Sequence, residues 1–197
     1  MRALGGESMK TALAYEKMWE FQKLMLEDIA TSKNKGIEDP SQFSLRTNIR
    51  TSSAYIEGTI YQLRLVCTAA SEDAPQFFSE SEILLLKEKS VSLNSKGKVQ
   101  EKDSFQKPIA SVLFLFSLFS RIHNIVFEPN LSDHKWDSFQ KFFKVRNDLM
   151  HPKSLLDFEI DEKKNKICVE AVVWFNGNLK ALYRECEKAD LAAKVST

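Results

Sequence analysis

The sequence has few cysteines, and they are placed where they do not suggest a shared role. Cys67, Cys168 and Cys186 are an odd number at wide spacing, and none of them belongs to a C-x-x-C motif. This pattern argues against a disulfide framework and against a zinc site built from cysteine. We therefore expect reduced thiols in a cytoplasmic protein.

The sequence also lacks a net charge of either sign. It contains 28 Lys and Arg residues against 27 Asp and Glu residues, so the formal net charge is +1. Phosphate is attracted over long range only by a protein with a positive field. Any contact with nucleic acid must therefore come from a local group of basic side chains.

Long apolar runs are absent as well. The most apolar segment, "IASVLFLFSLFSRIHNIVF" (109–127), is interrupted by Arg121, His123 and Asn124 within the ~20 residues that a membrane span requires. We therefore expect a buried central helix and no membrane segment. The N-terminus has no continuous apolar core, so we expect no signal peptide, and residues 1–8 are interpreted as a disordered start or a tag remnant.

The pattern that is present is helical almost throughout. Apolar residues recur at three- and four-residue steps, as in amphipathic helices. The expected helices cover residues 8–32, 42–70, 79–89, 109–127, 133–151 and 170–188, and Ser132 or Asp133 is expected to cap the fifth of them. With 197 residues, 43% of them hydrophobic, the chain is predicted to form a single domain over residues 9–190.

Two segments do not follow the helical pattern. Residues 90–108 are polar and end in proline, which predicts a mobile loop or insertion. Residues 158–170 surround a Lys-rich turn, which we interpret as a short extended hairpin. The predicted fold class is therefore an all-α bundle of about five helices with a polar loop insertion near residues 90–108.

One short motif carries the residues best suited to chemistry. In "VRNDLMHPK" (145–153), Arg146, Asn147 and His151 lie at the end of a helix rich in aromatic residues. Pro152 disfavours the helical conformation at the preceding residue, so the ring of His151 is expected to swing back toward Arg146. An arginine that binds phosphate and a histidine that moves protons suit phosphoryl chemistry. Alternatively, both side chains only cap the helix or pair with a carboxylate.

A polar stripe on another helix supplies candidate supporting groups. Four polar side chains share one face of the predicted helix 42–70: Arg46, Arg50, Ser53 and Glu57. Glu57 is expected to orient Arg146 or His151, and Arg50 to steer RNA. Lys153 follows the motif directly and is a candidate for contact with substrate phosphate. The alternative is a solvated helix face with no role in a site.

These features together resemble the HEPN superfamily. Its members carry an R-x(4–6)-H signature late in a central helix of an all-α domain, and a polar residue, often Asn, follows the arginine. Here "RNDLMHP" is preceded by "WDSFQKFFKV" and followed by a last predicted helix containing "AVVWFNGNLKALY". The resemblance is sharpest over residues 133–183 and extends as architecture over 10–183, without the segment 90–108.

The resemblance implies a specific activity. HEPN proteins of this type are metal-independent endoribonucleases, many of them toxins or phage-defence effectors, and they act as homodimers with the two motifs in a cleft at the interface. Arg146 would bind the scissile phosphate, His151 would act as general acid and base in attack by the 2′-hydroxyl, and Asn147 would hold both in place. No metal or other cofactor would be needed, and a partner would be an antitoxin such as a small nucleotidyltransferase.

Two other interpretations remain open. In one, the HEPN dimer keeps its motif but only binds RNA, a nucleotide or a partner protein. In the other, the motif match is accidental, and Arg146 pairs with a nearby acid in a closed surface. The remaining histidines, His123 and His134, are expected to have structural roles, and the lysines of the segment 87–102 are expected to be solvated.

Overall fold

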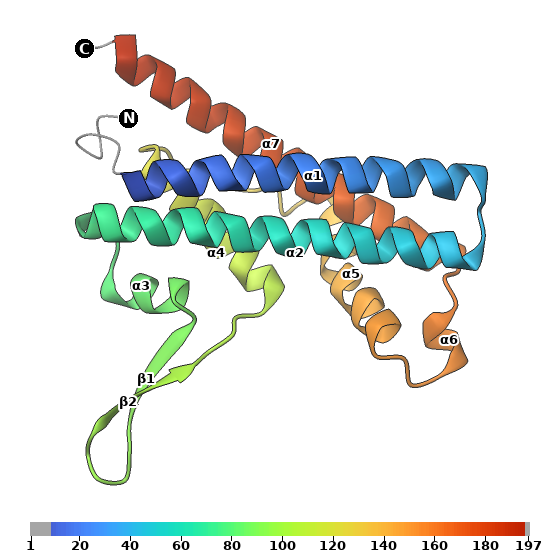
Figure 1. The fold of residues 1–197 in the computed structure, drawn as a ribbon, viewed down its shortest axis with the longest axis horizontal. Coiled ribbons are helices and arrows are strands. Elements are labelled where there is room, and N and C mark those ends of the chain that lie inside the picture. The colour runs from blue at the N-terminus through green and yellow to red at the C-terminus, as the bar shows by residue number, and fades with distance from the viewer. Residues whose placement is uncertain (1–8, 196–197) are drawn as a thin grey trace. The chain divides into compact units, whose positions relative to one another are not determined.

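The computed structural model describes residues 9–195, most of which are helical (Figure 1). In chain order the elements are α1 (Met9–Glu38), α2 (Gln42–Asp73), the 3-10 turn η1 (Pro75–Phe77), α3 (Glu80–Leu86), β1 (Lys89–Leu93), β2 (Val99–Asp103), α4 (Pro108–Ile122), α5 (His134–Met150), α6 (Leu155–Phe158) and α7 (Glu162–Val195). Apart from one small sheet, the predicted all-α class is confirmed. The prediction for residues 1–8 lies outside the described residues.

The long helices occur where the apolar periodicity placed them, with shifted ends. Helix α1 continues through Gly36 and ends before Pro40, which lacks the N–H that a helix interior needs. Of the two N-cap candidates for α5, Asp133 is the one used. Its side chain accepts a hydrogen bond of 2.9 Å from the backbone N–H of Lys135, which satisfies a free donor of the first turn.

The segment predicted as a mobile loop forms an antiparallel β-hairpin instead. Strands β1 and β2 pair in a register that places Leu93 opposite Val99. The side-chain oxygen of Asn94 accepts hydrogen bonds of 2.9 Å from the backbone N–H groups of Lys96 and Lys98, and Gly97 adopts a φ of +69°. This local turn chemistry, which glycine permits at positive φ, closes the hairpin.

The hairpin predicted at residues 158–170 was wrong. These residues form the end of α6, a three-residue connection (159–161) and the first turns of α7. The side chain of Asp161 accepts a hydrogen bond of 2.7 Å from the backbone N–H of Lys164, so it caps the start of α7. The lysines that suggested a turn are good helix formers once a cap is present.

The chain divides into two compact units, and each is described by itself. The first unit contains the described residues of the segments 1–18, 60–127 and 185–197, and the second unit contains 19–59 and 128–184. Helices α1, α2 and α7 each contribute to both units. The single domain over residues 9–190 stays a prediction.

In the second unit, aromatic rings join α5 to α7. Phe139 is fully buried, and its ring lies 4.6 Å from the ring of Trp174 and 6.0 Å from the ring of Phe175. Phe142 and Leu149 are also buried along α5, whereas the polar side chains of this helix, apart from the buried Ser138, are exposed or partly exposed. The apolar contacts therefore fix the rotation of α5 about its axis and decide which side chains emerge beside the core.

In the first unit, α4 contributes a large part of the core, as does the end of α2. Val112, Leu115, Phe116, Leu118 and Phe119 of this helix are buried, as expected for a central helix. Among the residues that the structure describes, no helix is both long enough and apolar enough to cross a membrane.

Candidate active site

The motif arginine on α5 is held by two side chains of α2. The Nε–H of Arg146 donates to the hydroxyl of Ser53 at 3.1 Å, and its Nη2 forms an ion pair with the carboxylate of Glu57. The Ser53 hydroxyl in turn donates to the other Glu57 oxygen at 3.1 Å. These three residues belong to the second unit, and the buried Ile49 and Ile56 of α2 orient the polar stripe toward α5.

Asn147 completes the set of contacts around the guanidinium. Its side-chain oxygen accepts a hydrogen bond of 2.7 Å from Nη1 of Arg146. A guanidinium has five N–H donors, and these contacts use three of them. The other two have no partner among the described residues, and 27% of the Arg146 side chain is exposed. The arrangement can therefore bind an anion without breaking the existing contacts.

His151 ends α5 and lies outside the regular helix. It adopts φ −130° and ψ 59°, and its backbone N–H donates to the carbonyl of Asn147 at 2.9 Å. The prediction that Pro152 removes His151 from the helix is thus confirmed. The imidazole is exposed and forms no hydrogen bond with another described residue, including Arg146. The ring is therefore accessible to a substrate.

The segment after the motif is fixed by one carboxylate. Asp157 accepts hydrogen bonds from the backbone N–H groups of Lys153 at 2.8 Å and Ser154 at 2.9 Å. The bond from Lys153 is the main reason why the pKa of Asp157 lies below its usual range. The chain is therefore anchored within a few residues of His151, while the Lys153 side chain stays exposed.

The polar stripe on α2 divides into residues with different surroundings. Ser53 and Glu57 contact Arg146, whereas Arg46 donates to the carbonyl of Phe158 at 3.3 Å and lies 5.1 Å from the centre of its ring. Arg50 is exposed and has no hydrogen bond or ion pair with another described residue. The structure thus gives Glu57 a contact with the motif but gives none to Arg50 or Lys153.

Ser53 is the contact that the sequence prediction did not assign. It lies four residues before Glu57 on the same face of α2, so helical spacing placed it beside the carboxylate. A small hydroxyl next to apolar positions gives no separate signal of a role. Only the approach of α5 shows that Ser53 binds Arg146 and Glu57 together.

The other two histidines have partners, as expected for structural roles. In the first unit, His123 contacts Tyr15 through one ring nitrogen and Asp190 through the other. His134 lies beside the carboxylate of Asp133 at 3.1 Å. Within residues 9–195, no group of three or more His, Cys, Asp or Glu side chains is arranged to hold a metal ion.

The ion pair between Arg146 and Glu57 agrees with two of the sequence interpretations. In the nuclease interpretation, Glu57 orients an arginine that binds phosphate. In the interpretation of an accidental motif match, the ion pair has only a structural role. The structural interpretation also expected a closed surface, but both partners are partly exposed and His151 is accessible. The geometry thus presents two free guanidinium donors and an accessible imidazole in the same unit.

Comparison with known proteins adds no family to this description. No protein-family model matches the chain, and neither the curated proteins nor the solved structures contain a significant match.

Proposed function

We propose that the chain is a metal-independent endoribonuclease of the HEPN type. The observation that carries the proposal is the state of Arg146: its orientation is set by Ser53, Glu57 and Asn147, and two of its N–H donors remain for a phosphate. The accessible imidazole of His151, five residues further along the chain, supplies the side-chain type that most often serves as general acid and base in catalysis.

The proposed reaction needs no reactant besides the RNA. The 2′-hydroxyl attacks the adjacent phosphorus, and His151 takes up its proton. The P–O5′ bond breaks, His151 returns the proton to the leaving 5′-oxygen, and the products carry a 2′,3′-cyclic phosphate and a 5′-hydroxyl. Arg146 binds the phosphate and stabilises the charge that develops in the transition state. Because the attacking group belongs to the substrate, no metal-bound water is required.

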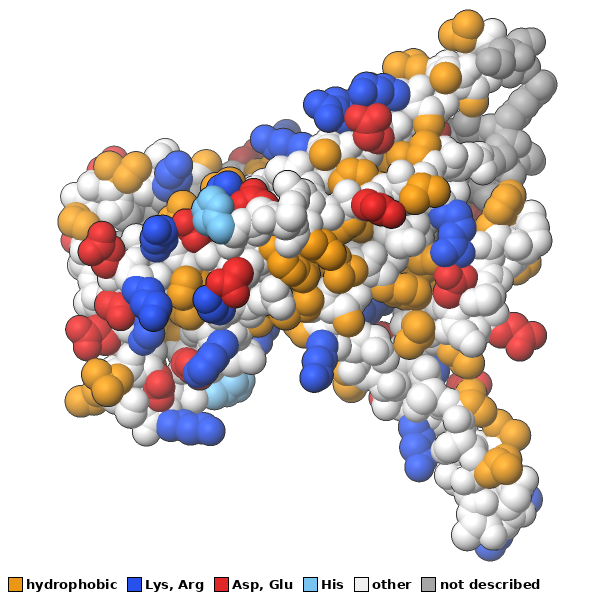
Figure 2. All heavy atoms as spheres, turned by 180° about the vertical axis from the view of Figure 1, so that it is seen from behind, with side chains coloured by type: hydrophobic (Ala, Val, Ile, Leu, Met, Phe, Trp, Pro, Cys, Tyr) orange, Lys and Arg blue, Asp and Glu red, His pale blue; other side chains and the backbone are white. Residues whose placement is uncertain are grey.

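The remaining candidates act around this centre. Glu57 and Asn147 keep the guanidinium in place, and Arg50 and Lys153 contact neighbouring phosphates of the RNA backbone. On the face shown in Figure 2, Lys and Arg side chains are interspersed with Asp and Glu side chains. That mixture, together with the formal net charge of +1, favours a narrow RNA target over a broad degradative activity.

The HEPN resemblance extends the proposal to assembly and biology. We infer a homodimer in which two copies of the motif meet, acting in the cytoplasm as a toxin or a phage-defence effector. An antitoxin protein, for example a small nucleotidyltransferase, would silence it. The buried cysteines, all without a disulfide, suit a reducing compartment.

The test is incubation of the full chain with total cellular RNA in EDTA. Wild type is expected to cleave, and Arg146→Ala and His151→Ala are expected to remove cleavage while circular dichroism shows folded protein. The cleaved ends should carry 2′,3′-cyclic phosphates. Lys163→Ala is the control, because Lys163 is exposed and lies outside the candidate site. Cleavage that survives both motif substitutions would show that the motif is not the site.

A second candidate is a HEPN dimer that binds RNA, a nucleotide or a protein without cleaving anything. One observation favours it: the His151 ring makes no hydrogen bond with Arg146, so the two groups are not joined before a substrate binds. This candidate predicts that folded wild type leaves all RNA intact in EDTA. Binding of labelled RNA that Arg146→Ala weakens would then support it.

A further inference from the structure

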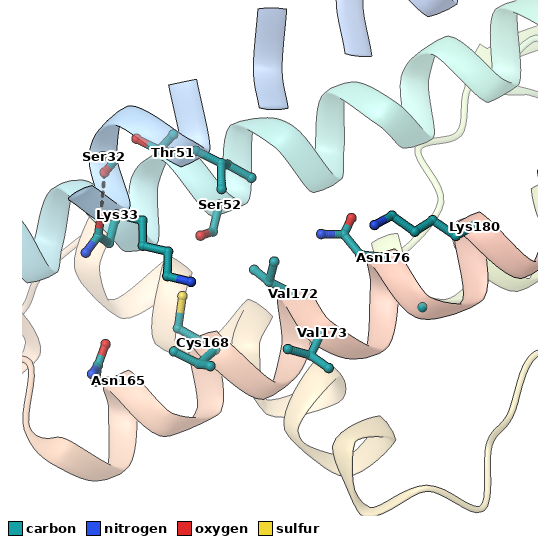
Figure 3. Close-up of a pocket in the computed structure, with 14 residues that line it drawn as sticks. Ser32, Lys33, Thr51, Ser52, Asn165, Cys168, Val172, Val173, Asn176 and Lys180 are labelled. Atoms are coloured by element: carbon teal, nitrogen blue, oxygen red, sulfur yellow. Dashed lines mark hydrogen bonds between the residues drawn. The ribbon is translucent and has the colours of Figure 1, made fainter. Parts of the chain in front are cut away.

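A pocket of about 480 Å³ opens in the second unit, among residues of α1, α2 and α7 (Figure 3). The volume lies in the range of pockets that hold small organic ligands. None of the residues assigned to the candidate active site, Ser53 included, lines it. The pocket is therefore separate from the proposed nuclease site, and its function has to be considered separately.

One part of the pocket wall is apolar. Ile29, Val172 and Val173 line it, and Cys168 lies beside them. Burial raises the pKa of the Cys168 thiol to about 11, despite an opposing hydrogen bond with Ser52. The thiol is therefore neutral at pH 7, and this wall suits a hydrocarbon or ring surface.

Two lysines give the pocket a positive charge. Figure 3 shows the side chains of Lys33, from α1, and Lys180, from α7, extending toward each other from opposite ends of the pocket. Neither forms an ion pair or a hydrogen bond with another described residue, and no acidic residue is among those that line the pocket. By contrast, Lys135, Lys141 and Lys144 each pair with an aspartate.

An amide adds a neutral donor to this space. The side-chain oxygen of Asn176 accepts a hydrogen bond from the hydroxyl of Tyr55, whose pKa burial raises to about 12. This contact turns the amide nitrogen of Asn176 into the pocket, where it has no acceptor among the described residues (Figure 3). Two ammonium groups and one amide thus offer donors only, and an anion supplies the matching acceptors.

We propose that this pocket binds a small organic anion that carries its charge on an apolar body. The carboxylate or phosphate head group pairs with Lys33 or Lys180 and accepts from Asn176. The apolar body packs against Val172 and Val173. All ligands of this class have an anionic head group joined to an apolar chain or ring. The apolar part is smaller than that of a membrane lipid.

Gly177 provides a way to close the pocket without disturbing its surroundings. This residue lies on α7 and lines the pocket, and a Cβ added there meets no atom within 4 Å. A leucine at this position would fill the part of the pocket that the apolar body of the ligand is proposed to occupy. An alanine adds only the Cβ, so Gly177→Ala is the matched control for Gly177→Leu.

Isothermal titration of the full chain with decanoate, below its micelle concentration, tests the proposal. We expect saturable binding of one decanoate per chain. Decanol and decyltrimethylammonium, which have the same chain without the negative charge, should bind at least about tenfold more weakly. Inorganic phosphate should not bind, because it lacks the apolar body. Titration with decyl phosphate in place of decanoate shows whether the pocket prefers a phosphate or a carboxylate head group. Binding of either ligand supports the proposal.

The variants locate the binding. The double substitution of Lys33→Met with Lys180→Met should weaken decanoate binding at least about tenfold, and Gly177→Leu should abolish it. Lys163→Met and Gly177→Ala should bind like wild type. The proposal would be overturned if neither decanoate nor decyl phosphate binds wild type, or if the ligand that binds wild type binds both altered pockets normally. A change in sedimentation mass caused by Gly177→Leu would also overturn it, because the pocket would then be a contact between copies of the chain.

Discussion

The two units place a histidine in opposite situations. In the first unit, His123 is only 12% exposed, with Nε2 at 2.7 Å from the hydroxyl of Tyr15 and Nδ1 at 3.0 Å from both carboxylate oxygens of Asp190. In the second unit, His151 is exposed and its ring contacts no other described residue through a hydrogen bond. The first ring is committed to holding three helices together, and the second is available to a substrate.

The arginines differ in a similar way. In the first unit, Arg121 binds both carboxylate oxygens of Glu82, at 3.1 and 2.9 Å, as a bidentate pair. In the second unit, Arg146 meets only one oxygen of Glu57, while Ser53 binds the other. A bidentate pair joins two elements of the fold, whereas separate contacts from a serine, a glutamate and an asparagine set the direction of a guanidinium.

The largest effect is expected when each of the two histidines is replaced by alanine and the rates of RNA cleavage are compared. His151→Ala is expected to lower the rate of RNA cleavage by roughly 10²–10⁴-fold, the usual contribution of a general acid or base. His123→Ala should leave the rate per folded molecule unchanged. Initial rates on a labelled RNA, corrected for the folded fraction, measure both. Equal losses in the two variants would contradict the distinction between the rings.

The free energy of unfolding should be affected in the opposite order, with the larger loss in His123→Ala. His123→Ala removes a shared partner of Tyr15 and Asp190 in a mostly buried site, which we expect to cost about 1–3 kcal/mol of unfolding free energy. His151→Ala, at an exposed position, should stay within about 0.5 kcal/mol of wild type. Urea denaturation followed by circular dichroism gives both values. The exposed His134 is the control, and His134→Ala should resemble His151→Ala.

The two arginine–glutamate pairs allow a finer comparison. Glu57→Gln should lower kcat by roughly tenfold to a hundredfold, because Arg146 loses the charged contact that sets its direction. Glu82→Gln, in the first unit, should leave kcat unchanged. Steady-state kinetics of the two variants separates an orienting carboxylate from a structural one. A fall in kcat for Glu82→Gln that matches the fall for Glu57→Gln would count against that separation.

The smallest effects concern acid stability. Burial opposes ionisation of Glu82, but the hydrogen bonds from Arg121 and Ser79 and the charge of Arg121 together outweigh it, so the pKa of Glu82 is lowered. The pKa of Asp157 is also lowered, chiefly by the backbone N–H of Lys153. A carboxylate with a lowered pKa stabilises the folded state above its unfolded value of about 4, and this stabilisation is lost as the pH falls through the folded value.

We therefore expect thermal unfolding temperatures to fall between about pH 5 and pH 3, less steeply in Glu82→Gln and in Asp157→Asn than in wild type. Asp157→Asn should in addition lower the cleavage rate a few-fold, because the segment after His151 loses its anchor, whereas Glu82→Gln should not. Melting curves at half-unit pH steps and cleavage rates at pH 7 test both statements. Parallel pH curves for wild type and both variants would refute the assignment.

Several features of the fold and of the candidate site could be predicted from the sequence, because they depend on residues close together in the chain. Helix positions follow from the spacing of apolar residues, and the exit of His151 from α5 follows from Pro152. The contact between Glu57 and Arg146 was predicted from a polar stripe beside an apolar one, since a mid-helix carboxylate near isoleucines needs a partner. The Asp133 cap was one of two adjacent candidates that the sequence did not distinguish.

Other features were decided only by tertiary structure. The sequence predicted a loop where the hairpin Lys89–Asp103 lies and a hairpin where α7 begins, because polar, Lys-rich segments have no apolar periodicity to separate a turn from a helix end. The role of Ser53 depends on the approach of α5. Lys33 and Lys180 are unremarkable in the sequence, and only the packing of α1 against α7 in the second unit brings them to one pocket. Periodicity specifies which side of a helix is buried, but long-range packing specifies which polar groups meet.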